Sequence, residues 1–302
     1  MIIEVNNLQK TYGSLRAVDG ISFQVKKGEI FGILGPNGAG KTTAVECIEG
    51  IRKPDTGQIK IMGLDPQRDA SKIKEITGIQ LQESMLPDRI RVWEALKLFG
   101  AFYKHRIDIE MLIDEFGLTD KRNSMFDKLS GGQKQRLSIA MALVNDPQVV
   151  FFDELTTGLD PQARRSAWER IRRVRDMGKT VVLVTHFMDE AEFLCNRIAV
   201  IDHGKIIAMD TPNKLIKEFG SGIRISFRNS NPEVLEKLNN ANGISEFKQI
   251  GTEVTLKASS MREVANIIQL LANEEEALSG FNLKQPTLED VFIQLTGRKI
   301  RE

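Results

Sequence analysis

Cysteine and long apolar runs are both scarce in this sequence. The two cysteines, Cys47 and Cys195, lie far apart and among apolar neighbours, so we expect small buried thiols in a reducing cytosol and no disulfide framework. No stretch approaches the roughly 18 apolar residues that a membrane-spanning helix needs, and residues 1–5 do not begin like a signal peptide. If the protein serves a membrane, we expect it to act from the surface through another chain.

An excess of charge of either sign is also absent. The net charge of +1 gives no overall attraction to nucleic acid or to an acidic membrane. The remaining composition, 41% hydrophobic and 27% charged, is ordinary for a globular protein. A chain of 302 residues exceeds one typical domain, so we expect two.

A glycine-rich loop carries the clearest chemistry in the sequence. It fits the phosphate-binding pattern G-x-x-x-x-G-K-[ST] at every specified position. A predicted buried strand, residues 30–34, precedes it, and a predicted helix, residues 42–48, follows, which disfavours an accidental glycine-rich turn. Glycines let backbone N–H groups converge on phosphate oxygens, and the helix N-terminus faces the same charge. The loop consists of Gly35, Pro36, Asn37, Gly38, Ala39, Gly40, Lys41, Thr42 and Thr43.

Two carboxylates follow the apolar run of residues 149–152, which is typical of a central parallel strand. Ligands of such sheets bind beyond the carboxyl ends of the strands, where the phosphate loop also lies. Asp153 would hold Mg²⁺ together with the Thr42 hydroxyl, and Lys41 would contact the β- and γ-phosphates. Glu154 would polarise a water that attacks the γ-phosphate. The alternative is that the two carboxylates cap a helix.

Three further positions could complete a nucleotide site. His186 ends another apolar run, residues 181–185, and we expect it at the same sheet edge as Asp153. Tyr12 precedes the phosphate loop and could stack on an adenine, although its spacing alone favours a surface tyrosine. A second helix start with paired glycines could bind another anion, but alone it is weak evidence. This start contains Ser130, Gly131, Gly132 and Gln133.

Beyond residue 220 the pattern of the chain changes. Strands and helices are predicted in the order β-α-β-β-α-β, which suggests a small ferredoxin-like unit. A last helix, capped by Thr287, places four apolar side chains on one face. We expect this face to need a partner surface, on the first domain or on a second protomer. The four are Leu288, Val291, Phe292 and Leu295.

Together these motifs resemble the nucleotide-binding subunit of an ABC transporter, in the family's order over residues 1 to about 220. The resemblance implies ATP and Mg²⁺ as cofactors and an α/β, P-loop NTPase fold. Residues 1–220 would form the ATPase domain, whose mixed sheet carries an antiparallel β subdomain and a helical subdomain at about 84–145. Residues 221–302 would form a small α+β accessory domain with a regulatory role.

The resemblance also assigns roles to single residues. Tyr12 becomes the adenine-stacking aromatic, Asp160 the D-loop aspartate and His186 the switch histidine. Residues 129–133 become the signature sequence, and residues 149–154 become the Walker B strand with its catalytic glutamate.

The Q-loop position has two candidate glutamines, and one position departs from the family pattern. Gln82 becomes the Q-loop glutamine, with a catalytic and a metal-binding role. Gln80 competes with it, and we prefer Gln82 because it precedes an acidic residue and the helical insertion. Leu155 stands where the family usually has proline, which stiffens the loop but carries no chemistry.

The mechanism that the resemblance implies needs two chains and a membrane protein. Ser130 cannot easily reach Lys41 of its own chain but can reach that of a second copy, so a homodimer would enclose two ATP molecules in composite sites. A separate transmembrane permease would convert the closing and opening into transport, with this chain peripheral on the cytoplasmic face of the membrane.

Residues 285–292 resemble bacterial drug-exporter ATPases of the daunorubicin-resistance type, which implies export. The alternative is an ABC ATPase that acts on ribosomes or nucleic acid. Such proteins usually carry two cassettes or a long coiled-coil insertion, and neither is present, so no nucleic acid partner is expected.

Overall fold

The chain divides into two compact units, Met1–Pro212 and Asn213–Glu302. The structure, a computed structural model, describes residues 1–80, 86–220, 222–229, 231–239, 243–272, 277–278 and 280–297. The division falls at the start of helix α8 (Pro212–Phe219), whereas the boundary expected from the sequence lies after residue 220.

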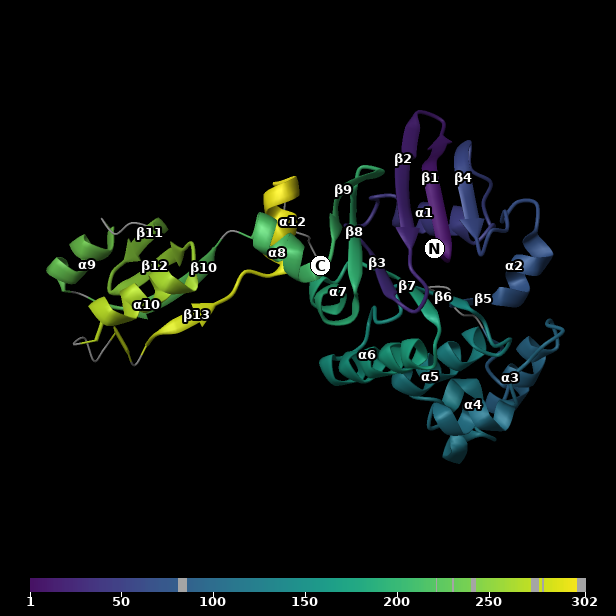
Figure 1. Ribbon diagram of the computed structural model, residues 1–302. Helices are drawn as coiled ribbons and strands as arrows, with labels where there is room; N and C mark the ends of the chain where they lie inside the picture. Colours follow the sequence, from purple (N-terminus) through teal and green to yellow (C-terminus); the bar gives the residue numbers. More distant parts are fainter. Residues whose placement is uncertain are drawn as a thin grey trace. The chain divides into compact units, whose positions relative to one another are not determined.

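An antiparallel sheet forms the N-terminal part of the first unit (Figure 1). Ile3 of β1 lies opposite Val25 of β2 and Ile61 of β4, and apolar residues of these strands alternate toward one buried face. The antiparallel β subdomain that the family resemblance implies is therefore present. In order across the sheet, the strands are β2 (Leu15–Val25), β1 (Ile3–Tyr12) and β4 (Thr56–Ile61).

A six-stranded mixed sheet forms the centre of the first unit. Every residue of β3, β6 and β7 is buried, as expected for parallel strands covered on both faces. The edge strand β9 runs antiparallel to β8, so the predicted α/β fold with a mixed sheet is confirmed. The order is β5 (Thr77–Gln80), β6 (Val149–Asp153), β7 (Thr180–Thr185), β3 (Ile30–Leu34), β8 (Arg197–Asp202) and β9 (Lys205–Asp210).

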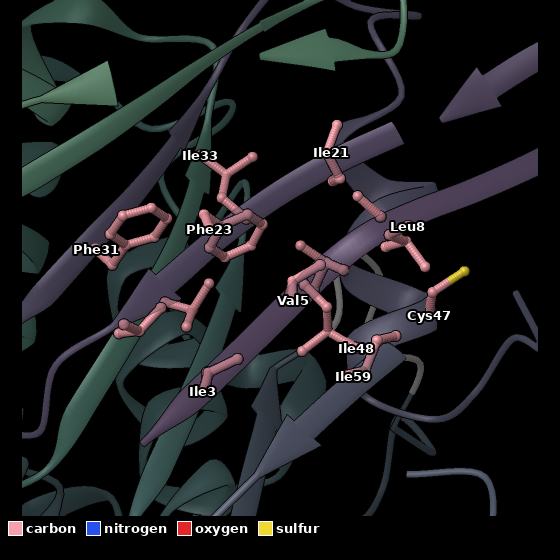
Figure 2. Close-up of a cluster of buried hydrophobic side chains, with 14 of the residues drawn as sticks. Ile3, Val5, Leu8, Ile21, Phe23, Phe31, Ile33, Cys47, Ile48 and Ile59 are labelled. Atoms are coloured by element: carbon pink, nitrogen blue, oxygen red, sulfur yellow. The ribbon is translucent and has the colours of Figure 1, made fainter. Parts of the chain in front are cut away.

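One hydrophobic core joins the two sheets through helix α1 (Lys41–Ile48) (Figure 2). Phe23 of β2 stacks on Phe31 of β3 with ring centroids 5.1 Å apart. Ile48 and Cys47 of α1 are fully buried in the same core. Close packing of this kind fixes the connection between β3 and α1, because shifting it would open voids.

Several helices complete the first unit. Helix α3 contacts both α4 and α5, and the three form the predicted helical region. Cys195, after α7, is buried and free, as is Cys47. The helices are α2 (Ala70–Ile76), α3 (Val92–Gly100), α4 (Ile109–Glu115), α5 (Gly131–Ala142), α6 (Pro161–Asp176) and α7 (Met188–Leu194), with short 3₁₀ turns at Thr119–Lys121 and Phe126–Lys128.

The second unit contains a four-stranded sheet with antiparallel neighbours, in the order β11-β12-β10-β13. Apolar residues of β10 and β12 alternate into a core with helices α9 and α10. The β-α-β-β-α-β order is the one predicted from the sequence. Its elements are β10 (Ile223–Arg228), α9 (Pro232–Asn239), β11 (Ile244–Ile250), β12 (Glu253–Ala258), α10 (Met261–Leu270) and β13 (Asn282–Lys284).

Helix α12 (Leu288–Thr296) follows this sheet. Thr287 precedes it, and its N–H donates to Asp290 Oδ2 over 2.9 Å. Leu288, Val291 and Phe292 are all buried within the single chain. The partner surface expected for this face is therefore supplied within one chain for these three residues, without a second protomer.

Candidate functional site

The phosphate loop joins the buried strand β3 to α1 at a position that only glycine fits. Gly40 caps α1 with φ at 99°, in the left-handed region that glycine tolerates. A Cβ on Gly40 would lie 2.0 Å from Ala17 O, and one on Gly35 would lie 2.2 Å from Ile201 O. The chain around the loop therefore leaves no room for side chains at either glycine.

Lys41 lies at the first position of α1, with 5% of its surface exposed. Its ammonium donates to Pro36 O over 3.1 Å and lies 3.8 Å from Glu154 Oε1. Burial lowers the pKa of Lys41, and the negative charges of Glu154 and Asp153 oppose that shift. The loop thus holds a buried cation beside two carboxylates, close to where phosphates would lie.

Asp153 ends β6 and is 7% exposed. Burial and the charge of Glu154 raise the pKa of Asp153 to about 6, against the charge of Lys41 and a hydrogen bond from Thr42 that lower it. Its buried Oδ1 has no hydrogen-bond partner among the residues that the structure describes. A carboxylate oxygen without a partner next to a threonine hydroxyl fits a Mg²⁺ ion, which takes one or two protein ligands together with phosphate oxygens.

Glu154 follows β6 with φ at 47°, a left-handed conformation that costs a residue other than glycine roughly 1–3 kcal/mol. Its N–H donates to Val184 O of β7 over 3.0 Å. Its Oε1 lies 3.1 Å from Nδ1 of His186, directly beyond the end of β7. Because β6, β7 and β3 are consecutive in the sheet, their ends bring Glu154, His186 and Lys41 together.

Tyr12 belongs to the same cleft as the phosphate loop, which the sequence alone did not decide. The cleft has a volume of about 510 Å³, and Tyr12, Lys41 and Glu154 all line it. Lys10 Nζ lies 5.6 Å and the Arg52 guanidinium carbon 5.3 Å from the tyrosine ring centroid, within the range of cation–π attraction.

The cleft also has lining residues that sequence reasoning missed. Leu15, Arg16 and Ala17 come from the start of β2, and His203 and Gly204 come from the turn between β8 and β9. No motif in the turn at residues 202–204 indicated that it would reach the phosphate loop.

The signature residues lie elsewhere in the chain. Gln133 N donates to Ser130 Oγ over 3.3 Å, and Ser130 N donates to Gln133 Oε1 over 2.9 Å. The two side chains therefore cap the N-terminus of α5. Ser130, Gly131, Gly132 and Gln133 are not among the residues that line the described cleft.

Three other candidate residues do not line the cleft or lie outside the described residues. Asp160 caps α6 by accepting from Ala163 N over 2.8 Å and does not line the cleft either. Gln80 ends β5, opposite Phe152. Gln82, the preferred Q-loop glutamine, lies outside the described residues.

Family models match both parts of the chain. The model described as "ABC transporter" matches residues 18–157, and the model described as "ATP-binding protein DrrA1-3-like, C-terminal domain" matches residues 196–296. The second match agrees with the resemblance of residues 285–292 to exporter ATPases of the daunorubicin-resistance type.

Curated relatives are similar over the whole chain. The Nod factor export ATP-binding protein I of Paraburkholderia xenovorans (strain LB400) is 38% identical over 99% of this chain and 98% of its own length. The linearmycin resistance ATP-binding protein LnrL of Bacillus subtilis (strain 168) is 32% identical over 100% of both chains.

Solved structures share the fold over about 70% of the chain. An ATP-binding subunit of an ABC transporter superposes with a TM-score of 0.65 and 27% identity, over 72% of this chain and 93% of that one. A dimeric ATP-binding cassette in a post-hydrolysis state, bound to ADP and Pi, superposes with a TM-score of 0.61 and 26% identity, over 69% of this chain and 98% of that one. The chain therefore belongs to the family of ABC transporter ATP-binding subunits.

Proposed function

We propose that this chain hydrolyses MgATP between two copies of itself and thereby powers export through a separate membrane permease. The observation that carries the proposal is the cluster of Lys41, Glu154 and His186 at one edge of the sheet, beside the phosphate loop. These residue types, together with the glycine loop, are those that phosphoryl transfer to water requires.

Each residue of the cluster has a task in this scheme. The loop N–H groups and Lys41 bind the β- and γ-phosphates. Glu154 orients the attacking water and holds its proton as the water oxygen bonds to the γ-phosphorus and the bond to ADP breaks. His186 orients the Glu154 carboxylate from 3.1 Å. Thr42 and Asp153, with Gln82 as a further ligand, would hold Mg²⁺, which would supply positive charge to the phosphate oxygens.

Tyr12 binds the adenine end of the nucleotide in this scheme. Its ring lines the same cleft as Lys41 and Thr42, and stacking on a base is tolerant of small shifts because it uses the whole face of the ring. Lys10 and Arg52 help to hold the ring in place.

A second copy supplies the rest of the site. The N-terminus of α5 at Ser130 presents backbone N–H groups that favour an anion, yet it does not line the cleft of its own chain. Two chains related by a two-fold axis place Ser130 and Asp160 of each beside the ATP of the other. A related cassette forms a dimer with ADP and Pi bound.

Export through another chain is supported by the relatives, whose names state Nod factor export and linearmycin resistance. In the part of the chain that the structure describes, no helix has the length and apolarity to cross a bilayer. We place the chain at the cytoplasmic face of the membrane, bound peripherally to its permease.

Complementation between two inactive variants tests the composite site. Lys41→Ala removes the phosphate cation, and Ser130→Arg blocks the helix start, so each variant alone should hydrolyse almost no ATP. A 1:1 mixture forms mixed dimers that contain one intact site. If mixing is random and the sites act independently, about a quarter of wild-type activity returns.

The matched control mixes Lys41→Ala with Glu154→Gln. Both defects then lie in the same half of the composite site, so no mixed dimer contains an intact site and no activity returns. Tagging one variant shows that mixed dimers form. Mixed dimers of Lys41→Ala and Ser130→Arg without activity would contradict the composite site.

A further inference from the structure

The loop that carries Glu154 is attached to three other elements. Glu154 N donates to Val184 O of β7 over 3.0 Å. Leu155 O accepts from Gln135 Nε2 of α5 over 2.8 Å. The Thr156 hydroxyl donates to Glu190 Oε1 of α7, also over 2.8 Å. Consecutive residues are therefore held by a strand and two helices.

Glu190 is fully buried, and so is Thr156. The same Oε1 of Glu190 also accepts from Trp168 Nε1 of α6 over 3.0 Å. Burial raises the pKa of Glu190, and hydrogen bonds with Thr185, Thr156 and Trp168 oppose that shift. A buried carboxyl group is costly unless it is hydrogen-bonded, and this one joins α7 to the catalytic loop and to α6.

These attachments matter because Glu154 itself is strained. Its φ of 47° lies in the left-handed region, and a residue other than glycine stays there only when its surroundings hold it. Leu155, unlike a proline, does not lock its own φ, so hydrogen bonds to neighbouring elements help to hold this loop. The Thr156 bond lies two positions beyond Glu154, on the side away from β6.

We propose that Thr156 and Glu190 are positioning residues for the Glu154 carboxylate, fixing its loop so that the carboxylate meets His186 and the attacking water. The inference rests on the proposed hydrolytic function. Neither residue lines the described cleft, so they act through the loop and not on the nucleotide. Losing their bond should therefore lower kcat and leave the KM for ATP unchanged.

Thr156→Val tests this, because it keeps the shape of the side chain and removes the hydroxyl. We expect kcat to fall roughly tenfold with KM for ATP unchanged, as losing one buried hydrogen bond shifts the carboxylate. Thr156→Ser keeps a hydroxyl and should restore most of kcat. Glu190→Gln keeps the acceptor oxygen and should also retain most of kcat.

Thr180→Val is the matched control. Thr180 is equally buried, begins β7 at the end of the strand far from His186, and accepts from Gly28 N over 2.9 Å. This variant should lower Tm and leave kcat unchanged. Thr156→Ala provides a second hydroxyl-free variant, without the bulk of valine, should Thr156→Val fold poorly.

Wild-type kcat in both hydroxyl-free Thr156 variants would overturn the inference, and so would equal losses of kcat in Thr156→Val and Thr180→Val. Wild-type protein and Glu154→Gln are measured alongside. Absence of hydrolysis by the wild type, or full hydrolysis by Glu154→Gln, would instead overturn the proposed function, so the two failures are distinguishable.

Discussion

His186 Nδ1 lies 3.1 Å from Glu154 Oε1, although the two residues follow different strands of the central sheet. The contact orients a carboxylate whose backbone is held in a left-handed conformation. His186→Ala should therefore reduce kcat for ATP by about 10²-fold or more, while ATP still binds. His105→Ala, at an exposed histidine, is the control and should hydrolyse at the wild-type rate. Equal rates for the two variants would remove His186 from the site.

Tyr12 provides a test of the adenine end of the cleft. Tyr12→Ala should raise the KM for ATP by roughly 5- to 150-fold, the range expected for losing one stacked base, with kcat at saturation unchanged. Tyr12→Phe keeps the ring and should behave like the wild type. Steady-state kinetics over a range of ATP concentrations measures both constants, and an unchanged KM in Tyr12→Ala would show that the ring does not stack on adenine.

The raised pKa of Glu49 makes the free energy of unfolding depend on pH. Glu49 follows α1 as the C-terminal cap, with 8% of its surface exposed. Burial, together with the charges of Asp153 and Glu46, raises its pKa from 4.5 to about 8. Between these two values the folded state binds a proton that the unfolded state has lost. The free energy of unfolding therefore falls as pH rises through this window, by up to about 1.4 kcal/mol per pH unit from this group.

Glu49→Gln mimics the protonated form and removes this dependence. Its stability relative to the wild type should increase from pH 5 to about pH 8 and then stay level, because both states are ionised above that value. Urea denaturation at a series of pH values measures the difference. A difference in stability between Glu49→Gln and the wild type that stays constant with pH would contradict the raised pKa of Glu49.

The sequence predicted the parts of the site that lie within single local patterns. Residues 30–34, the glycine loop and α1 form a continuous strand–loop–helix, and residues 149–154 form a buried strand with its acidic end. In these segments the local backbone conformation is determined by residues that are close in sequence. The spacing of apolar residues and glycines therefore predicts it.

Contacts between distant segments could not be predicted in the same way. Arg52 lies beside Tyr12 because β1 and α1 pack together, and the Thr156–Glu190 bond joins the loop after β6 to α7. Helix α12 shows the same limit, since its amphipathic pattern identified the apolar face but not what buries Leu288 and Phe292 within the chain.

Glu154→Gln gives the most direct test of the whole account, since the amide keeps the shape of the side chain and loses the carboxylate that holds the water's proton. Purified wild type, Glu154→Gln and the exposed control Glu169→Gln are compared at saturating MgATP, by the rate of phosphate release and by gel filtration with ATP in the buffer. We predict that Glu154→Gln binds ATP, releases phosphate at least about 10²-fold more slowly than the wild type and elutes as a dimer with ATP, whereas Glu169→Gln matches the wild type. Phosphate release by Glu154→Gln at the wild-type rate would contradict the account.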